Sequence, residues 1–225
     1  MSTSTGAVTD RQGGPPLLVP AAAFGALTVV GALLGGAGPR PGSTPDEVLA
    51  YATANGPVMA AGAAVLLGSA FPLVVFAATL VRRMQRLGVT APGPLIGLAG
   101  AVLAAASISV SGLVSWTAAQ TAVLGDPALT RMLATLWFAT GGVGFVAPFG
   151  LLLLGIAVPA LVRGLLPRVL GWAAAAVGVL ALLSTFALFS DVLYPLLPVG
   201  RFGGVVVVLA TAALLPASRP ARGAA

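Results

Sequence analysis

Long apolar runs that contain no charged residue constrain this chain more than any other feature of its sequence. Five runs are long enough to cross a bilayer and a sixth is shorter, and the 11 basic and 5 acidic residues all lie between or around them. About 20 residues of α-helix cover the roughly 30 Å hydrocarbon core of a membrane. The sequence therefore predicts an all-α fold, a polytopic membrane helix bundle with six transmembrane helices. The expected spans cover residues 17–37, 57–81, 94–117, 133–162, 169–190 and 202–217.

Composition and length support the same class. Of the 225 residues, 58% are hydrophobic and 7% are charged, whereas about 25% of the residues of a soluble domain are charged. We expect a disordered cytoplasmic tail over 1–16, one six-helix transmembrane domain over 17–217, and a basic cytoplasmic tail over 218–225. Cleavage of the first span as a signal peptide stays open, although no clear small-x-small cleavage site precedes Pro39.

The loop between the first two spans contains a helix-start signal. Thr44 suits the N-cap, Pro45 the first helical position and Glu47 the capping-box position. Asn55-Gly56-Pro57 is typical of a helix end. The sequence therefore predicts a short extracellular surface helix over 45–54, which ends before the second span begins.

The fourth run is longer than a straight crossing needs. It covers 133–162 and contains Pro148 and Pro159. We expect tilt, a proline kink or an interfacial first turn to absorb the extra length.

The arginines predict the orientation. The net charge of +6 is carried by Arg, because the chain has no Lys. If the N-terminus is inside, eight of the 11 arginines lie on the cytoplasmic side, in agreement with the positive-inside rule. This predicts a multi-pass protein of the cell membrane with both termini cytoplasmic. The three external arginines would be Arg40, Arg131 and Arg201.

Several kinds of chemistry are excluded by the residues that the sequence lacks. The chain has no Cys and no His, which excludes disulfides, thiol nucleophiles, thiolate metal sites and imidazole ligands or bases. No ionisable residue falls inside a predicted span, where such residues usually mark function. We therefore expect no enzyme activity, no catalytic residues, no metal and no cofactor. The arginines are scattered through loops, so we also expect no nucleic acid partner.

One polar pattern lies inside a predicted span. Ser107, Ser111 and Ser115 are spaced four residues apart on the third helix, and Gln120 lies beyond its outer end. Small hydroxyl residues at this spacing form a seam where helices approach closely. The same hydroxyls could line a path for a small neutral solute, and the sequence leaves both interpretations open.

The order of these features resembles a family of uncharacterised actinobacterial six-span membrane proteins, which are loosely related to those grouped under the unknown-function domain DUF4386. The resemblance implies the six-span fold and a membrane location, and it transfers no activity and no site residues. The segments that carry it are Ser43-Thr44-Pro45-Asp46-Glu47-Val48-Leu49-Ala50-Tyr51, Asp126-Pro127-Ala128 and Leu166-Pro167-Arg168-Val169-Leu170-Gly171-Trp172.

The sequence favours a non-catalytic structural, accessory or regulatory role in the membrane. The lipid bilayer is the first expected partner, and a membrane protein or a second copy of the chain is the other candidate. The alternative is a transporter or permease for a small neutral solute.

Overall fold

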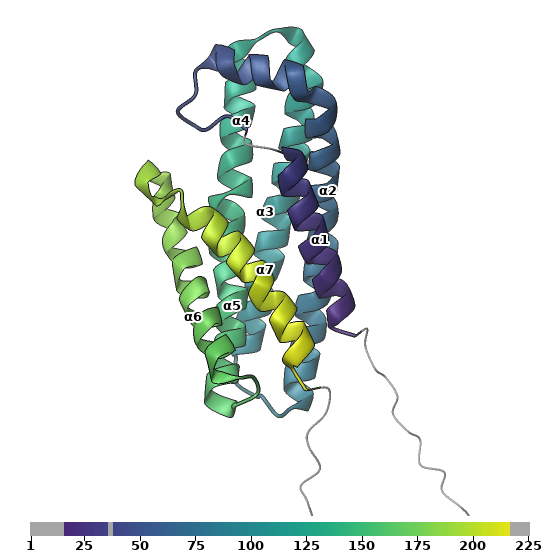
Figure 1. Ribbon diagram of the computed structural model, residues 1–225, viewed down its shortest axis with the longest axis vertical. Helices are drawn as coiled ribbons and strands as arrows, with labels where there is room; N and C mark the ends of the chain where they lie inside the picture. Colours follow the sequence, from purple (N-terminus) through teal and green to yellow (C-terminus); the bar gives the residue numbers. More distant parts are fainter. Residues whose placement is uncertain (1–15, 36–37, 217–225) are drawn as a thin grey trace, which may run out of the picture.

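The computed structural model describes residues 16–35 and 38–216 and shows an all-α helix bundle (Figure 1). Within these residues the chain forms α-helices and short 3-10 turns, and no strand. The predicted tails lie outside the described residues, apart from residue 16 of the first. The α-helices are α1 (Leu18–Gly35), α2 (Pro45–Arg86), α3 (Gly93–Thr121), α4 (Pro127–Gly141), α5 (Val143–Arg163), α6 (Arg168–Leu183) and α7 (Leu196–Leu214).

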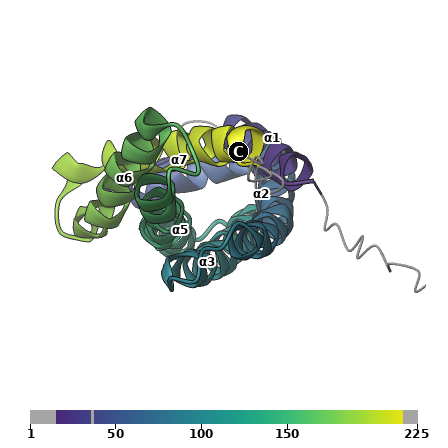
Figure 2. The same cartoon turned by 90° about the horizontal axis from the view of Figure 1, so that it is seen from below.

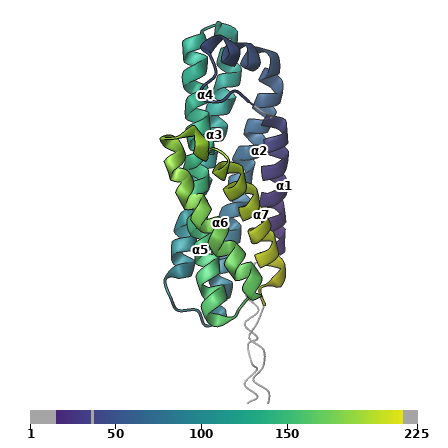
Figure 3. The ribbon, with the colours of Figure 1, turned by 60° about the vertical axis from the view of Figure 1, so that its left-hand side comes forward.

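Among the described residues, six helical stretches are long and apolar enough to cross a membrane, as the sequence predicts. The helices α4 and α5 together make one of them. In the bundle, α3 packs between α2 and α5, α1 packs on α2, and α6 packs on α5 at the edge (Figure 2). The last helix, α7, contacts both α6 and α1 and so closes the ring. We call the end where α2 begins the upper end, and the end where α1 begins and α7 ends the lower end (Figures 1 and 3).

The core of the bundle is aromatic and closely packed. Phe149 of α5 stacks on Phe145 at 5.1 Å between ring centroids and meets Phe24 of α1 edge-on at 5.7 Å. All three side chains are fully buried. Glycines bring α3 and α5 together, since a Cβ added to Gly155 would lie 2.7 Å from the Cα of Gly97. In a membrane, where packing rather than the hydrophobic effect holds helices together, such close approach is the main source of cohesion.

The predicted surface helix exists, but it does not end where the sequence predicts. The capping box is confirmed, because Thr44 N donates to Glu47 Oε2 at 2.8 Å and Glu47 N donates to Thr44 Oγ1 at 3.3 Å. The predicted end at Asn55-Gly56-Pro57 is wrong, since α2 continues without interruption to Arg86. Gly56 keeps a negative φ, so it does not adopt the left-handed conformation of a helix end.

Instead of ending, α2 bends. Its first turns lie across the upper end of α3 and α4, and the helix then turns down into the bundle (Figure 1). Pro57 lies inside the helix and removes one hydrogen bond from its ladder, which is a common cause of a bend. A small separate core fixes the first turns to α3, with Ala52 and Met59 packed against Ala118 and Ala122.

The fourth and sixth spans also differ from what the sequence predicts. The fourth span is interrupted at Gly142 and not at a proline, because Pro148 and Pro159 both lie inside the continuous helix α5. The sixth span does not begin at residue 202, because α7 begins at Leu196 and has 19 residues. These two differences create the site described next.

Candidate functional site

The chain between α4 and α5 breaks at a pair of glycines. Gly142 has φ −80° and ψ −96°, which is neither helical nor extended. Neither glycine has room for a side chain: a Cβ would lie 2.3 Å from Ser111 Oγ at Gly141 and 2.6 Å from Phe138 O at Gly142. Gly141 therefore allows α4 to approach α3 closely, and Gly142 allows the backbone to turn close to Phe138 O at the end of α4.

The break leaves carbonyl groups at the end of α4 that need donors from outside the helix. Trp137 O accepts from Ser111 Oγ of α3 at 3.1 Å and from Thr140 Oγ1 at 3.3 Å. Gly141 O accepts from a terminal nitrogen of Arg201, which lies in the second turn of α7. Side chains of two other helices thus donate to carbonyls at the end of α4, the kind of support that irregular backbone inside a membrane needs.

Arg201 lies within a helix that is apolar enough to span a membrane, on the side that faces the break. Its guanidinium carbon lies 5.1 Å from the centroid of the Phe145 ring at the start of α5. A cation over an aromatic face is attracted by the ring, and a cation at the C-terminal end of a helix is favoured by the helix dipole. The aromatic ring and the helix end together explain why the charged side chain lies at this position.

The prediction that Arg201 lies in an external loop is wrong, and so is the expectation that no ionisable residue lies inside a span. Two prolines, Pro195 and Pro198, precede Arg201 in the sequence and are typical of a loop. Proline is also well tolerated in the first turn of a helix, and Pro195 is the N-cap of α7 with Pro198 in its first turn. That rule, applied to this segment, would have extended the sixth span to include Arg201.

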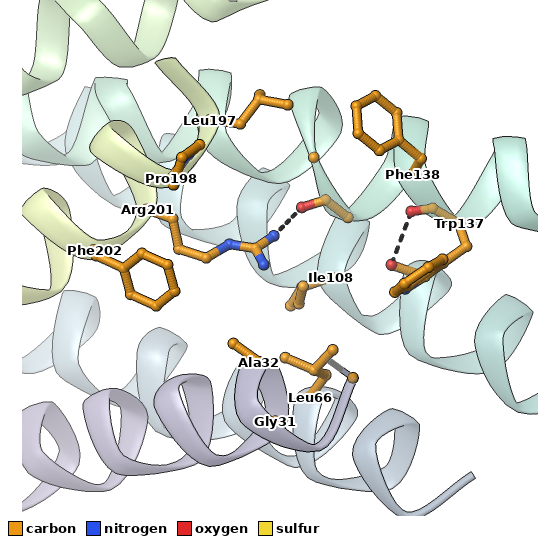
Figure 4. Close-up of a pocket in the computed structure, with 14 residues that line it drawn as sticks. Gly31, Ala32, Leu66, Ile108, Trp137, Phe138, Leu197, Pro198, Arg201 and Phe202 are labelled. Atoms are coloured by element: carbon orange, nitrogen blue, oxygen red, sulfur yellow. Dashed lines mark hydrogen bonds between the residues drawn. The ribbon is translucent and has the colours of Figure 1, made fainter. Parts of the chain in front are cut away.

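A cavity of about 330 Å³ lies beside the guanidinium of Arg201 (Figure 4). Arg201 is the one charged residue of its lining, and Ser111 contributes the one hydroxyl; the other lining residues are apolar or glycine, apart from the Trp137 indole. The lining residues, which come from α1, α2, α3, α4, the break and α7, are Gly31, Ala32, Gly35, Leu66, Ile108, Ser111, Trp137, Phe138, Gly141, Gly142, Leu197, Pro198, Arg201 and Phe202.

The cavity adjoins a second hollow nearer the surface. This outer hollow has a volume of about 810 Å³ and shares Phe138, Leu197 and Pro198 with the cavity. Its lining includes Arg40 and Asp191, one residue of each charge. The two spaces therefore lie side by side between α4 and the start of α7.

The structure separates the four polar residues that the sequence grouped. Ser111 is fully buried and lines the cavity, whereas Ser115, also buried, lines a different space of about 10 Å³ under the first turns of α2. Ser107 is half-buried and faces Gly144 of α5, with its Oγ 3.5 Å from a Cβ placed there. Gln120 is exposed near the end of α3. Whether these hydroxyls act as a seam or as a solute path stays a prediction.

The tryptophans also differ in their surroundings. Trp116 and Trp172 are at least half exposed, as expected of indoles at a membrane surface. Trp137 is turned inward and lines both the cavity and the small space at Ser115. Its side chain therefore lies between the two buried serines and belongs to the site.

No metal site accompanies this cavity. Among the described residues, no three acidic side chains gather closely enough to hold a metal ion. Comparison with known protein families, with curated proteins and with solved structures finds no match to this chain. The resemblance to the actinobacterial six-span family therefore stays a prediction. The cavity beside Arg201 is the feature of the molecule that bears on its function.

Proposed function

We propose that this is a non-catalytic membrane protein, with an accessory or regulatory role, that works by binding a ligand in the cavity beside Arg201. One observation carries the proposal: a cavity large enough for part of a small molecule is lined by a single cation, Arg201, from a helix apolar enough to span a membrane. A charge inside a membrane protein is costly and usually functional. A mostly apolar pocket with a few converging polar groups is the usual form of a ligand site.

The lining favours binding over catalysis. The cavity contains a guanidinium, a hydroxyl and an indole, and its lining includes no carboxylate. Arginine stays protonated and does not exchange protons at neutral pH. A site of this composition can attract and orient a negatively charged group, but it has no general base to start a reaction.

A permease for a small neutral solute is the second candidate. The outer hollow favours it, because this hollow shares Phe138, Leu197 and Pro198 with the cavity and so brings open space close to Arg201. The buried aromatic core of Phe24, Phe145 and Phe149 fills the interior of the bundle, so a passage to the lower end would need a rearrangement. Flux of a neutral solute such as glycerol or urea into proteoliposomes distinguishes this candidate from simple binding.

We also propose that the protein lies in the cell membrane with its lower end in the cytoplasm. Arg82, Arg83, Arg86, Arg163 and Arg168 all lie in or beside turns at the lower end, and such loops are normally cytoplasmic. The cavity then opens on the outer side. Reporter fusions after Arg86 and after Arg168 should report a cytoplasmic location, and an external signal from either would contradict this orientation.

Two glycine substitutions test ligand binding in the cavity. Gly35 lines the cavity, and a Cβ added there meets no atom within 4 Å. Gly35→Leu should therefore fill the cavity without a clash. Gly68 on α2 is equally open and lies outside the cavity lining, so Gly68→Leu is the matched control.

The measurement is native mass spectrometry of the protein released gently from its membrane. Wild type and Gly68→Leu should retain a bound small molecule that Gly35→Leu lacks. Equal occupancy in all three proteins, or no bound molecule in any of them, would contradict the proposed function.

A further inference from the structure

Most N–H donors of the Arg201 guanidinium make no hydrogen bond to the residues that the structure describes. Arginine carries five N–H donors, and the one hydrogen bond that the structure gives Arg201 goes to Gly141 O. The other terminal nitrogen points toward the side of the cavity lined by Ile108 and Ala32 (Figure 4). Because the cavity lining contains no Asp or Glu, the cation faces an apolar space without a protein counterion. A negatively charged ligand group would complement it.

The cavity is open between two helices that diverge. α1 and α7 touch near Gly25, where a Cβ would lie 3.2 Å from Val205 Cγ1. From there they separate toward the upper end of α1 and the start of α7 (Figures 1 and 3). Gly31, Ala32 and Gly35 of α1 face this wedge, and Phe202 lines it from α7. Small and apolar walls of this kind accommodate a hydrocarbon chain.

Arg201 lies toward the upper end of α7, on the side of one leaflet. α1 and α7 have 18 and 19 residues, so each is about 28 Å long, close to the thickness of the hydrocarbon core. Arg201 lies five residues after the start of α7, about 8 Å along the helix. The cation therefore lies within about 8 Å of the upper end of α7, on the side of the upper leaflet and its phosphates.

We propose that the ligand is a membrane lipid with a net negative headgroup, whose phosphate lies beside Arg201 and whose acyl chain enters between α1 and α7. The identification rests on the proposed function, namely that the cavity binds a ligand. It accounts for a lone cation, an apolar wedge and a position toward one leaflet, all at one place. A soluble anion would explain the cation but not the wedge.

Lipid competition on the purified protein tests this identity. The protein in mixed micelles is offered phosphatidylglycerol and phosphatidylcholine with the same chains, and native mass spectrometry reports the bound ratio. Both headgroups carry a phosphate, but the quaternary ammonium of phosphatidylcholine adds a second cation beside the guanidinium, so wild type should prefer phosphatidylglycerol about tenfold. Arg201→Gln should lower the ratio to about one, and Arg201→Lys should keep part of the preference. Arg131→Gln, which changes an exposed arginine outside the cavity lining, should behave as wild type.

A second variant keeps the test valid if Arg201→Gln does not fold. Gly35→Leu leaves the cation in place and fills the space for the chain, so it should lose phosphatidylglycerol binding. Glycerol 3-phosphate, the soluble headgroup, should compete at least about tenfold less well than the lipid, because each buried methylene contributes about 0.8 kcal/mol.

The outcomes separate the two proposals. A wild-type ratio near one, or an unchanged ratio in Arg201→Gln, would overturn the anionic lipid. If both lipids bind equally and Gly35→Leu loses both, ligand binding in the cavity stands and only the charge class fails. Lipid binding that Gly35→Leu leaves unchanged would overturn both proposals. Equal affinity for glycerol 3-phosphate would replace the lipid by a soluble phosphate.

Discussion

Replacing Gly141 by alanine should destabilise the protein, because the new methyl group would meet Ser111. The Cβ would lie 2.3 Å from Ser111 Oγ and 3.2 Å from Ser111 Cβ. Overpacking of this kind costs about 1–3 kcal/mol. If the serine rotates away, its hydrogen bond to Trp137 O is lost as well, which adds about 0.6 kcal/mol in a membrane protein. We expect a loss of about 2 kcal/mol in the free energy of unfolding.

A double substitution identifies the clash as the cause. Ser111→Ala alone should cost about 0.6 kcal/mol, the value of one interhelical hydrogen bond. In Gly141→Ala/Ser111→Ala the closest contact is removed and the Cβ pair at 3.2 Å remains. The double variant should therefore be more stable than Gly141→Ala, with a coupling of about 1 kcal/mol or more.

The assay is reversible unfolding of the purified variants in mixed micelles as the fraction of sodium dodecyl sulfate rises. Gly68→Ala is the control, because its Cβ meets nothing within 4 Å, and it should be neutral or stabilising by up to about 1 kcal/mol. If Gly141→Ala behaves like Gly68→Ala, or if the two substitutions are additive, the close approach of α3 and α4 at the break is not as described.

Three further substitutions test the fold around the site. Thr44→Ala removes the capping box of α2 and should cost about 1 kcal/mol, seen as faster amide exchange over 45–50; unchanged exchange would contradict the cap. Tyr51→Phe removes the hydrogen bond from Tyr51 Oη to Gly35 O at 2.9 Å and should cost about 0.5–1.5 kcal/mol, whereas a neutral result would mean that this contact is not formed. Gly155→Ala places a methyl group 2.7–3.0 Å from backbone atoms of α3 and should cost at least about 2 kcal/mol in the same unfolding assay; a stable variant would exclude the close α3–α5 packing.

The class of fold could be predicted from the sequence because it depends on local properties. Runs without charge must be buried in lipid or protein, and their length sets the number of crossings. The capping box at Thr44 was also predictable, since the bonded groups lie three residues apart. The helix end predicted from Asn55-Gly56-Pro57 was wrong. Ala52 and Met59 pack against α3 and its end, and these tertiary contacts override the local preference for a turn.

The site could not be predicted because it depends on contacts between distant segments. Nothing local to Gly141-Gly142 indicates a break, since it is one of four Gly-Gly pairs in a chain with 30 glycines. The break is defined by Ser111, 30 residues earlier, and by Arg201, 60 residues later. An arginine near the end of one span, taken together with a glycine pair inside another span, would have indicated a contact between the two spans.

The most direct test of the account asks whether Arg201 sets the electrostatic potential of the cavity. Because the chain has no natural cysteine, Ala32→Cys places a single thiol in the cavity lining opposite Arg201. An anionic methanethiosulfonate should modify this thiol about tenfold faster than a cationic methanethiosulfonate of similar size. The second substitution Arg201→Gln should abolish this preference, and Arg131→Gln should leave it unchanged. Equal rates for both reagents, or a preference that survives Arg201→Gln, would contradict a cavity governed by this cation.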